Sequence, residues 1–562
     1  MNLGGQTRRR ALLSLAALLL LFTFQAAPAF AQDEQAVREM DELMSKAYPP
    51  DEPGAAVIVV KNGKTLLRKG YGLADVELGV KVEPDMVFRL GSITKQFTAA
   101  AILLLAERGK LSLSDDMTKF FPDYPAKGRV VTVEHLLTHT SGIKSYTSLP
   151  AWLSMWRKDM TVSELIDLFK NEPPDFAPGE QWAYNNSGYI LLGAIIEKVS
   201  GQTYEQFLRQ NIFEPLGMTH TFYGSATRVI PRRVPGYSKT KDGLQNAEYL
   251  SMTQPYAAGS LLSTVDDLAL WDAALYTEKL LRQASLQRAW TPYVLKDGTP
   301  TGYGFGWSKW QYEGHTVVEH GGGINGFTTM VVRFPDDRVY VAVLTNRDYS
   351  SPDGIAFKLA ALAAGKPLRP LVAVAIKPEE MDALAGVYRI NEREAYNIRH
   401  DGAKLTFQRN AGRQNEIFPL SPTVFFFDKE GFERVTFTKD SAGKVTGLKV
   451  TRRFGPPTAA ARTDKPLPKE REAVKLSAEV LERYVGVYEL TPTFSVEIVR
   501  RGEQLYAQAT GQPEVEIFPL SEKLFFLKVV DAQLEFQTGA DGKVTGLVLH
   551  QNGRDIPAKK VK

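Results

Sequence analysis

The C-terminal part of the chain contains an internal repeat. Gly386-Val-Tyr388 recurs as Gly486-Val-Tyr488, and Glu416-Ile-Phe-Pro-Leu-Ser421 recurs as Glu516-Ile-Phe-Pro-Leu-Ser521, in both cases 100 positions later. The composition around both copies favours short alternating strands and gives few helix signals. The repeat therefore predicts two tandem all-β units, each long enough for a small up-and-down barrel or a sandwich.

Proline-rich and charged segments indicate the domain boundaries. Lys366-Pro-Leu-Arg-Pro370 precedes the first copy, and a Pro/Ala/charge-rich stretch over 455–472 joins the two copies. A length of 562 residues suggests two to four domains. We expect one domain over 32–370, a first β-barrel repeat over 371–465 and a second over 466–562.

The first 31 residues have the composition of a secretory signal. Arg8-Arg9-Arg10 precedes an apolar run over 11–24, and Ala29-Phe30-Ala31 is a small-x-small cleavage site. The run is shorter than a membrane span requires. We expect a signal peptide of bacterial type over 1–31, and an exported, periplasmic or secreted protein without an integral membrane span after its removal. Both Sec and twin-arginine export remain open.

The bulk composition excludes several classes of function. Hydrophobic residues make up 44% of the chain and charged residues 23%, which is ordinary for a globular protein, and the formal charge of +4 shows no nucleic-acid-binding pattern. The chain has no cysteine, so disulfides and thiol chemistry are excluded. Its 7 histidines are scattered without a His-Glu-x-x-His pattern. We therefore expect no nucleic-acid partner, no metal and no cofactor.

Strand signals occur at both ends of the region before the repeat. Two apolar strands over 55–60 and 64–71 flank Asn62-Gly63, a strong hairpin signal, and further strands are expected over 316–319, 327–334 and 339–344. The segment between them is mostly helical. This order predicts an α+β domain with one antiparallel sheet closed by N- and C-terminal segments, helices on its faces and a helical subdomain.

One Ser-x-x-Lys motif opens a long apolar helix. Ser92 and Lys95 share a helix face, and burial would lower the pKa of Lys95 towards that of a base able to activate the Ser92 hydroxyl. Taken alone, this stretch is equally compatible with a helix cap and a solvated lysine. Context separates it from the other occurrences, which lie in polar or glycine-containing stretches: Ser141/Lys144, Ser238/Lys241 and Ser441/Lys444.

Two further segments supply polar groups for a catalytic site. Tyr184 and Asn186 lie in a polar stretch before an apolar helix, where a nearby ammonium could lower the pKa of Tyr184 enough for proton transfer. His320, Gly322 and Gly323 lie in a glycine-rich segment between two apolar strands, where the backbone can approach a ligand. Taken alone, the Tyr184 segment is more commonly an ordinary loop with Asn186 as a turn residue, and the glycine-rich segment is also compatible with a β-turn that carries an incidental histidine.

Together these motifs resemble the serine β-lactamases, penicillin-binding DD-peptidases, D-aminopeptidases and related esterases. Gly91-Ser-Ile-Thr-Lys95, Tyr184-Asn-Asn186 and His320-Gly-Gly322 are similar to the three motifs of that family, in the expected order over about 36–365. The resemblance implies that Ser92 is the acylated nucleophile and that Lys95 and Tyr184 move its proton. It also implies that Asn186, His320, Gly322 and Gly323 bind the substrate, with the N–H groups of Ser92 and Gly323 forming the oxyanion hole.

The third motif departs from the Lys-Thr-Gly of many family members. His320, mostly neutral near pH 7, replaces the fixed cation that would bind a substrate carboxylate, which disfavours β-lactam hydrolysis. A histidine at this position is similar to the D-aminopeptidases and esterases. The D-aminopeptidases can also carry two antiparallel β-barrel domains, lipocalin-like in appearance, which could shape the cleft or serve as contacts of a homo-oligomer.

We therefore predict an exported serine hydrolase that forms an acyl-enzyme on Ser92. Its expected substrates are small peptides or amides with D-residues, or simple esters. Two alternatives remain: a non-catalytic protein that senses penicillin or peptidoglycan through its β-domains, and a β-lactamase. A metalloenzyme is disfavoured because the histidines lack ligand spacing.

Overall fold

The computed structural model describes residues 33–562 except for positions 150, 151, 153, 241, 242, 313, 369, 403, 430, 454, 492, 493, 511, 513, 552 and 553. The predicted signal peptide over 1–31 therefore lies outside the described residues. The chain divides into two compact units, one combining residues up to 145 with 157–369 and the other combining 146–156 with 370–562. None of the helices in the described part of the chain is long and apolar enough to cross a membrane.

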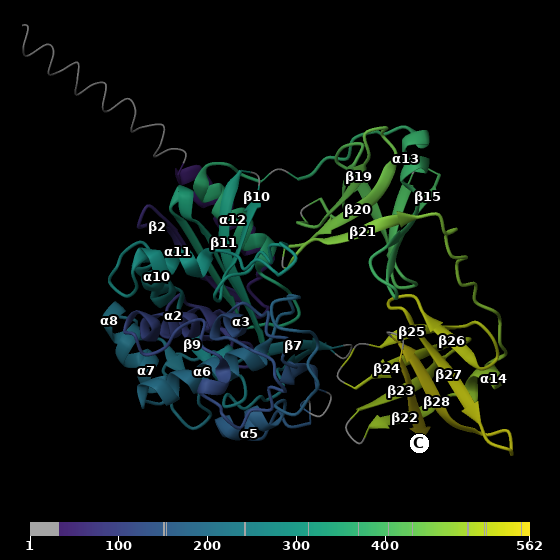
Figure 1. Ribbon diagram of the computed structural model, residues 1–562, viewed down its shortest axis with the longest axis horizontal. Helices are drawn as coiled ribbons and strands as arrows, with labels where there is room; N and C mark the ends of the chain where they lie inside the picture. Colours follow the sequence, from purple (N-terminus) through teal and green to yellow (C-terminus); the bar gives the residue numbers. More distant parts are fainter. Residues whose placement is uncertain are drawn as a thin grey trace, which may run out of the picture. The chain divides into compact units, whose positions relative to one another are not determined.

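A six-stranded antiparallel sheet lies at the centre of the first unit (Figure 1). Its order is β10-β11-β12-β13-β1-β2, and the strands are β1 Ala55–Lys61, β2 Lys64–Tyr71, β10 Ser308–Tyr312, β11 His315–Ile324, β12 Phe327–Phe334 and β13 Val339–Thr345. Asn62 and Gly63 have φ values of 52° and 75°, the left-handed values that a tight hairpin turn needs. The predicted hairpin and its closure by the late strands are confirmed.

The edge strand β10 was not expected from the sequence. Its segment, Ser-Lys-Trp-Gln-Tyr, has no clear apolar alternation, and it pairs with β11 only from His315 to Glu319. Beyond Glu319, β11 continues through His320 to Ile324 while paired with β12. Residues 320–324 are thus strand rather than turn, and among the described strands they have a neighbour on one side only.

A buried helix packs beside this sheet. In α2, Thr94–Glu107, every residue over 94–105 is buried, as expected for a helix that is apolar all round. It packs against α6 Asn186–Ser200, α7 Tyr204–Leu208 and α9 Tyr256–Gly259, whereas α10 Val265–Ala274 and α12 Asp353–Ala364 pack on strands of the sheet. These contacts fix the N-terminal turn of α2 from several directions.

Shorter elements complete the first unit. A helix covers residues 33–47, and a small three-stranded sheet has the order β5-β9-β6. The bounds are β3 Leu73–Asp75, β4 Val80–Lys81, β5 Phe88–Arg89, η1 Gly91–Ile93, η2 Met117–Lys119, α3 Val133–Leu137, α5 Val162–Asp167, η4 Arg209–Phe213, α8 Glu214–Leu216, β6 Phe222–Tyr223, β7 Tyr237–Thr240, β8 Gly243–Asn246, β9 Leu261–Ser263, α11 Gln283–Trp290 and η5 Pro335–Asp337.

The two predicted repeats form two closed, eight-stranded antiparallel barrels. After η3 Tyr146–Ser148 and α13 Pro378–Leu384, the first consists of β14 Gly386–Arg389, β15 Ala395–Asp401, β16 Lys404–Arg409, β17 Gln414–Pro419, β18 Val424–Phe426, β19 Arg434–Lys439, β20 Val445–Thr451 and β21 Thr458–Thr463. After α14 Ala478–Glu482, the second consists of β22 Gly486–Thr491, β23 Phe494–Arg501, β24 Gln504–Ala509, β25 Val515–Pro519, β26 Leu524–Leu527, β27 Ala532–Thr538, β28 Val544–Gln551 and β29 Arg554–Lys560.

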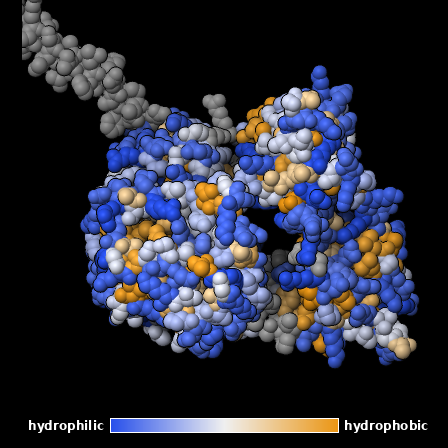
Figure 2. All heavy atoms as spheres, in the orientation of Figure 1, coloured by the Kyte–Doolittle hydropathy of each residue, from blue (hydrophilic) through white to orange (hydrophobic). Residues whose placement is uncertain are grey.

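Equivalent positions of the repeat play equivalent parts in the two barrels. The hydroxyls of Tyr388 and Tyr488 each donate a hydrogen bond to the carbonyl four residues earlier, at 2.6 and 2.7 Å. Each barrel contains a cluster of buried apolar side chains. On the face drawn in Figure 2, hydrophilic side chains predominate and apolar ones gather in separate patches. The barrel alternative is confirmed, and the whole chain has the predicted α+β fold followed by two barrels.

Candidate active site

The predicted nucleophile lies in the tight turn between β5 and α2. Ser92 is the middle residue of η1, which continues directly into α2, and Gly91 before it has a φ of 54°. A Cβ atom on Gly91 would lie 2.9 Å from the backbone nitrogen of Gly323. The glycine therefore lets the turn bearing Ser92 contact strand β11 directly.

Lys95 is fully buried beneath this turn. Its Nζ lies 3.0 Å from Ser92 Oγ, 2.9 Å from Asn186 Oδ1 and 2.9 Å from the carbonyl oxygen of Ala258. Burial lowers the pKa of Lys95 well below its usual value of 10.5. Among the described residues no carboxylate forms an ion pair with Lys95, so the cost of burying its charge is not offset by an acidic neighbour.

The partners of Lys95 also determine where its lone pair points when it is neutral. Asn186 Oδ1 and the Ala258 carbonyl can only accept hydrogen bonds, so they take the two N–H groups of a neutral amine. The third direction, towards Ser92 Oγ, is then available to accept the hydroxyl proton. This geometry suits Lys95 to act as a base towards Ser92.

Tyr184 and Asn186 lie beside Lys95, at the start of α6. Asn185 caps this helix by accepting a hydrogen bond from the Gly188 N–H at 2.8 Å, which leaves Asn186 as its first residue. Lys95 Nζ lies 4.8 Å from the centre of the Tyr184 ring. Three of the residues singled out in the sequence, Lys95, Tyr184 and Asn186, are thus brought together around Ser92.

The expected lowering of the Tyr184 pKa is wrong. Burial raises the pKa of Tyr184 above its usual value of 10, and a hydrogen bond with Ser92 opposes the rise. Because 39% of the residue is exposed, solvation limits the size of this rise. The expectation relied on a charged Lys95, whereas burial favours the neutral amine. Tyr184 is therefore better suited to hold a proton than to release one to water.

His320 lies on β11 with both ring nitrogens oriented by neighbours. Its Nδ1 lies 2.6 Å from the Gly321 carbonyl oxygen, which can only accept, so Nδ1 carries a proton. Its Nε2 lies 2.9 Å from the Tyr303 hydroxyl. In the neutral ring, Tyr303 donates this bond and Nε2 accepts it. The ring centres of His320 and Tyr184 are 6.2 Å apart, which places His320 beside Tyr184.

Gly322 and Gly323, the second and third glycines after His320, differ in their surroundings. A Cβ atom on Gly322 would lie 2.0 Å from the Leu90 carbonyl oxygen and 2.3 Å from Thr329 Oγ1, so only glycine fits without displacement. A Cβ atom on Gly323 would meet nothing within 4 Å. Gly322 lets β11 approach the segment before Ser92, and Gly323 follows it next to Gly91.

His139 is a buried residue whose part in the site the sequence did not reveal. Its φ is 61°, unusual for a residue other than glycine, and its Nδ1 accepts a hydrogen bond from the Asn185 N–H at 3.1 Å. Its ring centre lies 4.4 Å from that of Tyr184 and 4.7 Å from that of Tyr303. Burial lowers the pKa of His139 well below 6.5, and protonation of the neighbouring Lys95 or His320 would lower it further, so the ring is neutral.

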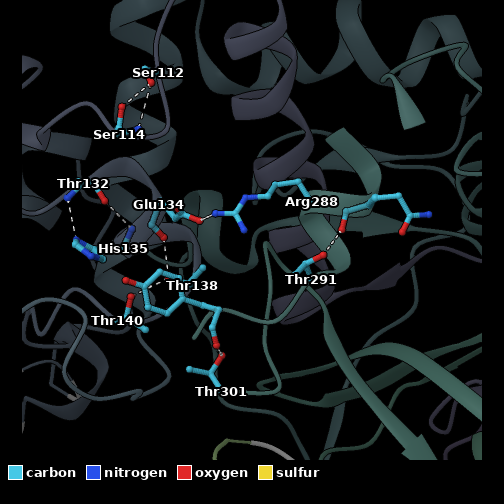
Figure 3. A network of polar contacts seen from close by, with 12 residues as sticks. Ser112, Ser114, Thr132, Glu134, His135, Thr138, Thr140, Arg288, Thr291 and Thr301 are labelled. Carbon is cyan, nitrogen blue, oxygen red and sulfur yellow. Dashed lines mark hydrogen bonds and ion pairs between the residues drawn. The ribbon is translucent and has the colours of Figure 1, made fainter. Parts of the chain in front are cut away.

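A polar network holds the segment before His139 (Figure 3). Thr132 caps α3, and its Oγ1 accepts a hydrogen bond from the His135 N–H at 3.2 Å. Thr138 donates to the Glu134 carbonyl at 2.8 Å and bonds to Thr140 at 2.8 Å, while Glu134 pairs with Arg288. The strained backbone of His139 therefore lies between anchored threonines.

Comparison with known proteins identifies the class. Residues 36–365 match the family described as Beta-lactamase, and residues 470–560 match one described as a domain of unknown function (DUF3471). The chain therefore belongs to the beta-lactamase family of serine hydrolases, and the predicted resemblance is confirmed. The second match falls within the second barrel repeat.

Individual relatives extend the similarity beyond the first unit. The chain is 26% identical to penicillin-binding protein 4* of Bacillus subtilis (strain 168), over 90% of this chain and 94% of that protein. The octameric penicillin-binding protein homologue from Pyrococcus abyssi is similar in structure, with a TM-score of 0.53 and 28% identity over 75% of this chain and 99% of that chain. A D-amino acid amidase from Ochrobactrum anthropi SV3 has a TM-score of 0.52 and 26% identity, over 59% of this chain and 98% of that chain.

Proposed function

We propose that this protein is an exported serine hydrolase that is acylated on Ser92 and cleaves small amides or peptides of the D-amino-acid type, or simple esters. The observation that carries the proposal is the 3.0 Å contact between Ser92 Oγ and the Nζ of a buried Lys95 whose pKa is lowered. The similarity to a D-amino acid amidase supports amide substrates. The signal-like composition of residues 1–31 supports export.

In the proposed acylation, neutral Lys95 accepts the proton of Ser92 as Oγ forms a bond to the substrate carbonyl carbon. The N–H groups of Ser92 and Gly323 then donate to the oxyanion, and Asn186 orients the acyl side. When the carbon–nitrogen bond breaks, Tyr184 gives its proton to the leaving amine and recovers one from the Lys95 ammonium. A water molecule then attacks the acyl carbon while neutral Lys95 accepts its proton, the bond between that carbon and Ser92 Oγ breaks, and Oγ takes the proton from Lys95 as the acid product leaves.

The surroundings of His320 favour amides and esters over β-lactams. In the neutral ring, Nε2 accepts a hydrogen bond from the Tyr303 hydroxyl, and the Nδ1 proton is donated to the Gly321 carbonyl. His320 therefore supplies no fixed positive charge to hold a substrate carboxylate, unlike the lysine of a Lys-Thr-Gly motif. We propose His320 and Gly322 as shaping the substrate side of the cleft, with β-lactam hydrolysis at most slow.

A fluorophosphonate probe tests the acyl-enzyme directly. We expect it to label the wild type at Ser92, located by peptide mass, and not to label Ser92→Ala. Ser441→Ala is the matched control, because Ser441 begins another Ser-x-x-Lys pattern but lies exposed in a turn between barrel strands. Labelling that persists in Ser92→Ala would overturn the assignment of the nucleophile.

Substrate assays then distinguish the alternatives. D-alanyl and L-alanyl p-nitroanilides test amide cleavage and its stereochemistry, p-nitrophenyl acetate tests esterase activity, and nitrocefin tests β-lactamase activity. We expect turnover of the D-anilide or the ester to exceed that of nitrocefin, and to vanish in Ser92→Ala. A protein that labels at Ser92 but turns over none of them would favour the penicillin- or peptidoglycan-sensing alternative.

A further inference from the structure

A cavity of about 430 Å³ lies in the first unit, and its lining does not include Ser92, Lys95, Tyr184, Asn186 or His320. Its lining combines apolar side chains, among them Met252, Leu262 and Phe327, with the side chains of Arg89 and Arg233. Pockets of this size that combine apolar walls with a few polar groups are typical of small-molecule sites. The cavity therefore has the volume and surface of a ligand site.

Arg89 is the residue of this cavity that indicates a charged ligand. Among the residues that the structure describes, none forms a hydrogen bond or an ion pair with its guanidinium. The Phe327 ring centre lies 5.6 Å from the guanidinium carbon. Burial lowers the pKa of Arg89, and the positive charge of Arg233 lowers it further. Arg89 is only partly buried, and because an arginine stays protonated in proteins, the cavity wall carries a positive charge with which no acidic side chain of the described residues pairs.

The other charged groups of the lining limit the charge of the ligand. Arg233 is exposed and donates to the Ser225 carbonyl at 2.8 Å. Asp75 and Glu248 also line the cavity, but neither pairs with Arg89, and Asp75 accepts a hydrogen bond from the Leu78 N–H. Two positive and two negative side chains leave the cavity without a net charge to attract a dianion. A ligand with one negative charge is enough to pair with Arg89.

We propose that this cavity binds a carboxylate that carries an apolar body. The carboxylate pairs with the fork of N–H groups on Arg89, and the apolar body lies against Met252, Leu262 and Phe327. An arginine fork matches the two oxygens of a carboxylate, which gives both affinity and orientation. None of the residues proposed for acylation lines this cavity, so the binding proposal does not depend on that chemistry.

The test measures binding of 3-phenylpropionate to the full chain by calorimetry and thermal unfolding, with 3-phenylpropionamide as the uncharged isostere and inorganic phosphate as a bare anion. We expect the carboxylate to bind and raise the Tm, and the amide and phosphate to bind at least about tenfold more weakly. Equal binding of the amide, or binding of phosphate alone, would overturn the assignment of a carboxylate.

The substitution Arg89→Met distinguishes an arginine that binds a ligand from one that stabilises the fold, because the two cases predict opposite changes in Tm and affinity. It removes an uncompensated charge, so we expect the Tm without ligand to stay level or rise while affinity for 3-phenylpropionate falls at least about tenfold. Arg232→Gln is the matched control, because Arg232 pairs with Glu83 and Asp85 and does not line the cavity. A lowered Tm with unchanged affinity would show that Arg89 is structural and overturn the proposal.

The position of the bound molecule is checked independently by NMR of [methyl-13C]methionine protein. The Met252 signal, assigned from Met252→Leu, should shift when 3-phenylpropionate is added. Met117, buried elsewhere in the first unit and absent from the lining, should not shift. Binding that leaves the Met252 signal unchanged would place the ligand elsewhere and contradict the proposal.

Discussion

Gly91 and Gly323 meet backbone to backbone: a Cβ atom on Gly91 would lie 2.9 Å from the nitrogen of Gly323. The contact joins the turn that bears Ser92 to strand β11, although the two segments are far apart in the sequence. The N–H groups of Ser92 and Gly323 are thereby held in neighbouring segments of a rigid scaffold. Such preorganisation is what an oxyanion site requires, because its donors must be in position before charge develops.

This contact predicts different results for substitutions at Gly322 and Gly323 of β11. Gly322→Ala would drive its Cβ into the Leu90 carbonyl, so we expect a lower Tm and a loss of more than about tenfold in kcat/KM as β11 shifts from Ser92. Gly323→Ala meets no atom within 4 Å and should keep the wild-type Tm. Thermal unfolding and kinetics on one preferred substrate measure both. A destabilised Gly323→Ala, or a Gly322→Ala like the wild type, would contradict this account of β11.

The state of Lys95 predicts how acylation depends on pH. Neutral Lys95 is the proposed base, so the rate of Ser92 labelling should rise as pH passes upward through the lowered pKa of Lys95, which lies below 10.5. The labelling rate is measured against pH with the fluorophosphonate probe. In Lys95→Arg the side chain stays charged, so labelling of Ser92 should be slow and its rate should not increase with pH. A wild-type rate that does not change with pH would argue against a lysine base.

The lowered pKa of Lys95 also predicts how the stability of the protein depends on pH. An unfolded Lys95 titrates near 10.5, whereas the folded residue titrates lower, so the unfolded state binds more protons between the two values. The free energy of unfolding should therefore gain a rising contribution as pH increases through that window. Chemical denaturation of the wild type and of Lys95→Met across this range measures it. If the free energy of unfolding rises equally with pH in the two proteins, burial does not lower the pKa of Lys95.

Much of this architecture could be predicted because the relevant signals are local. The turn at Asn62-Gly63 predicts its hairpin, and the repeat at an offset of 100 predicts two similar all-β units, for which a barrel was one of two expected forms. The sheet edge could not be predicted, because β10 is held by pairing with β11 rather than by its own pattern. The order of the motifs predicted that Ser92, Lys95, Tyr184 and Asn186 would meet. The raised pKa of Tyr184 was missed because it depends on burial by distant segments.

His139 is predicted to position Tyr184. His139→Asn keeps a residue type that tolerates a φ near 61° but removes the ring that packs against Tyr184 at 4.4 Å. We expect kcat to fall by about tenfold to a hundredfold with little change in KM, because the proposed proton donor loses its fixed position. Kinetics of His139→Asn are compared with those of Tyr184→Phe. A fall in Tm with unchanged kcat would assign His139 a purely structural part.

The buried ion pair between α10 and β12 predicts a large loss of stability. Arg333 is fully buried, its Nε lies 2.5 Å from Asp272 Oδ1, and its guanidinium carbon lies 4.7 Å from the centre of the Tyr276 ring. Asp272→Asn leaves the guanidinium charge buried without a counter-charge, which costs about 3–5 kcal/mol of unfolding free energy. Chemical denaturation measures this loss.

An exposed pair on the same helix is the control for that experiment. Asp266 forms a bidentate ion pair with Arg68 at 2.6 and 2.7 Å, but the two side chains are 35% and 41% exposed. Water stabilises the separated charges there, so Asp266→Asn should cost less than about 1 kcal/mol. Because the pairs differ mainly in burial, equal losses in the two variants would show that desolvation of Arg333 is not the source of the effect.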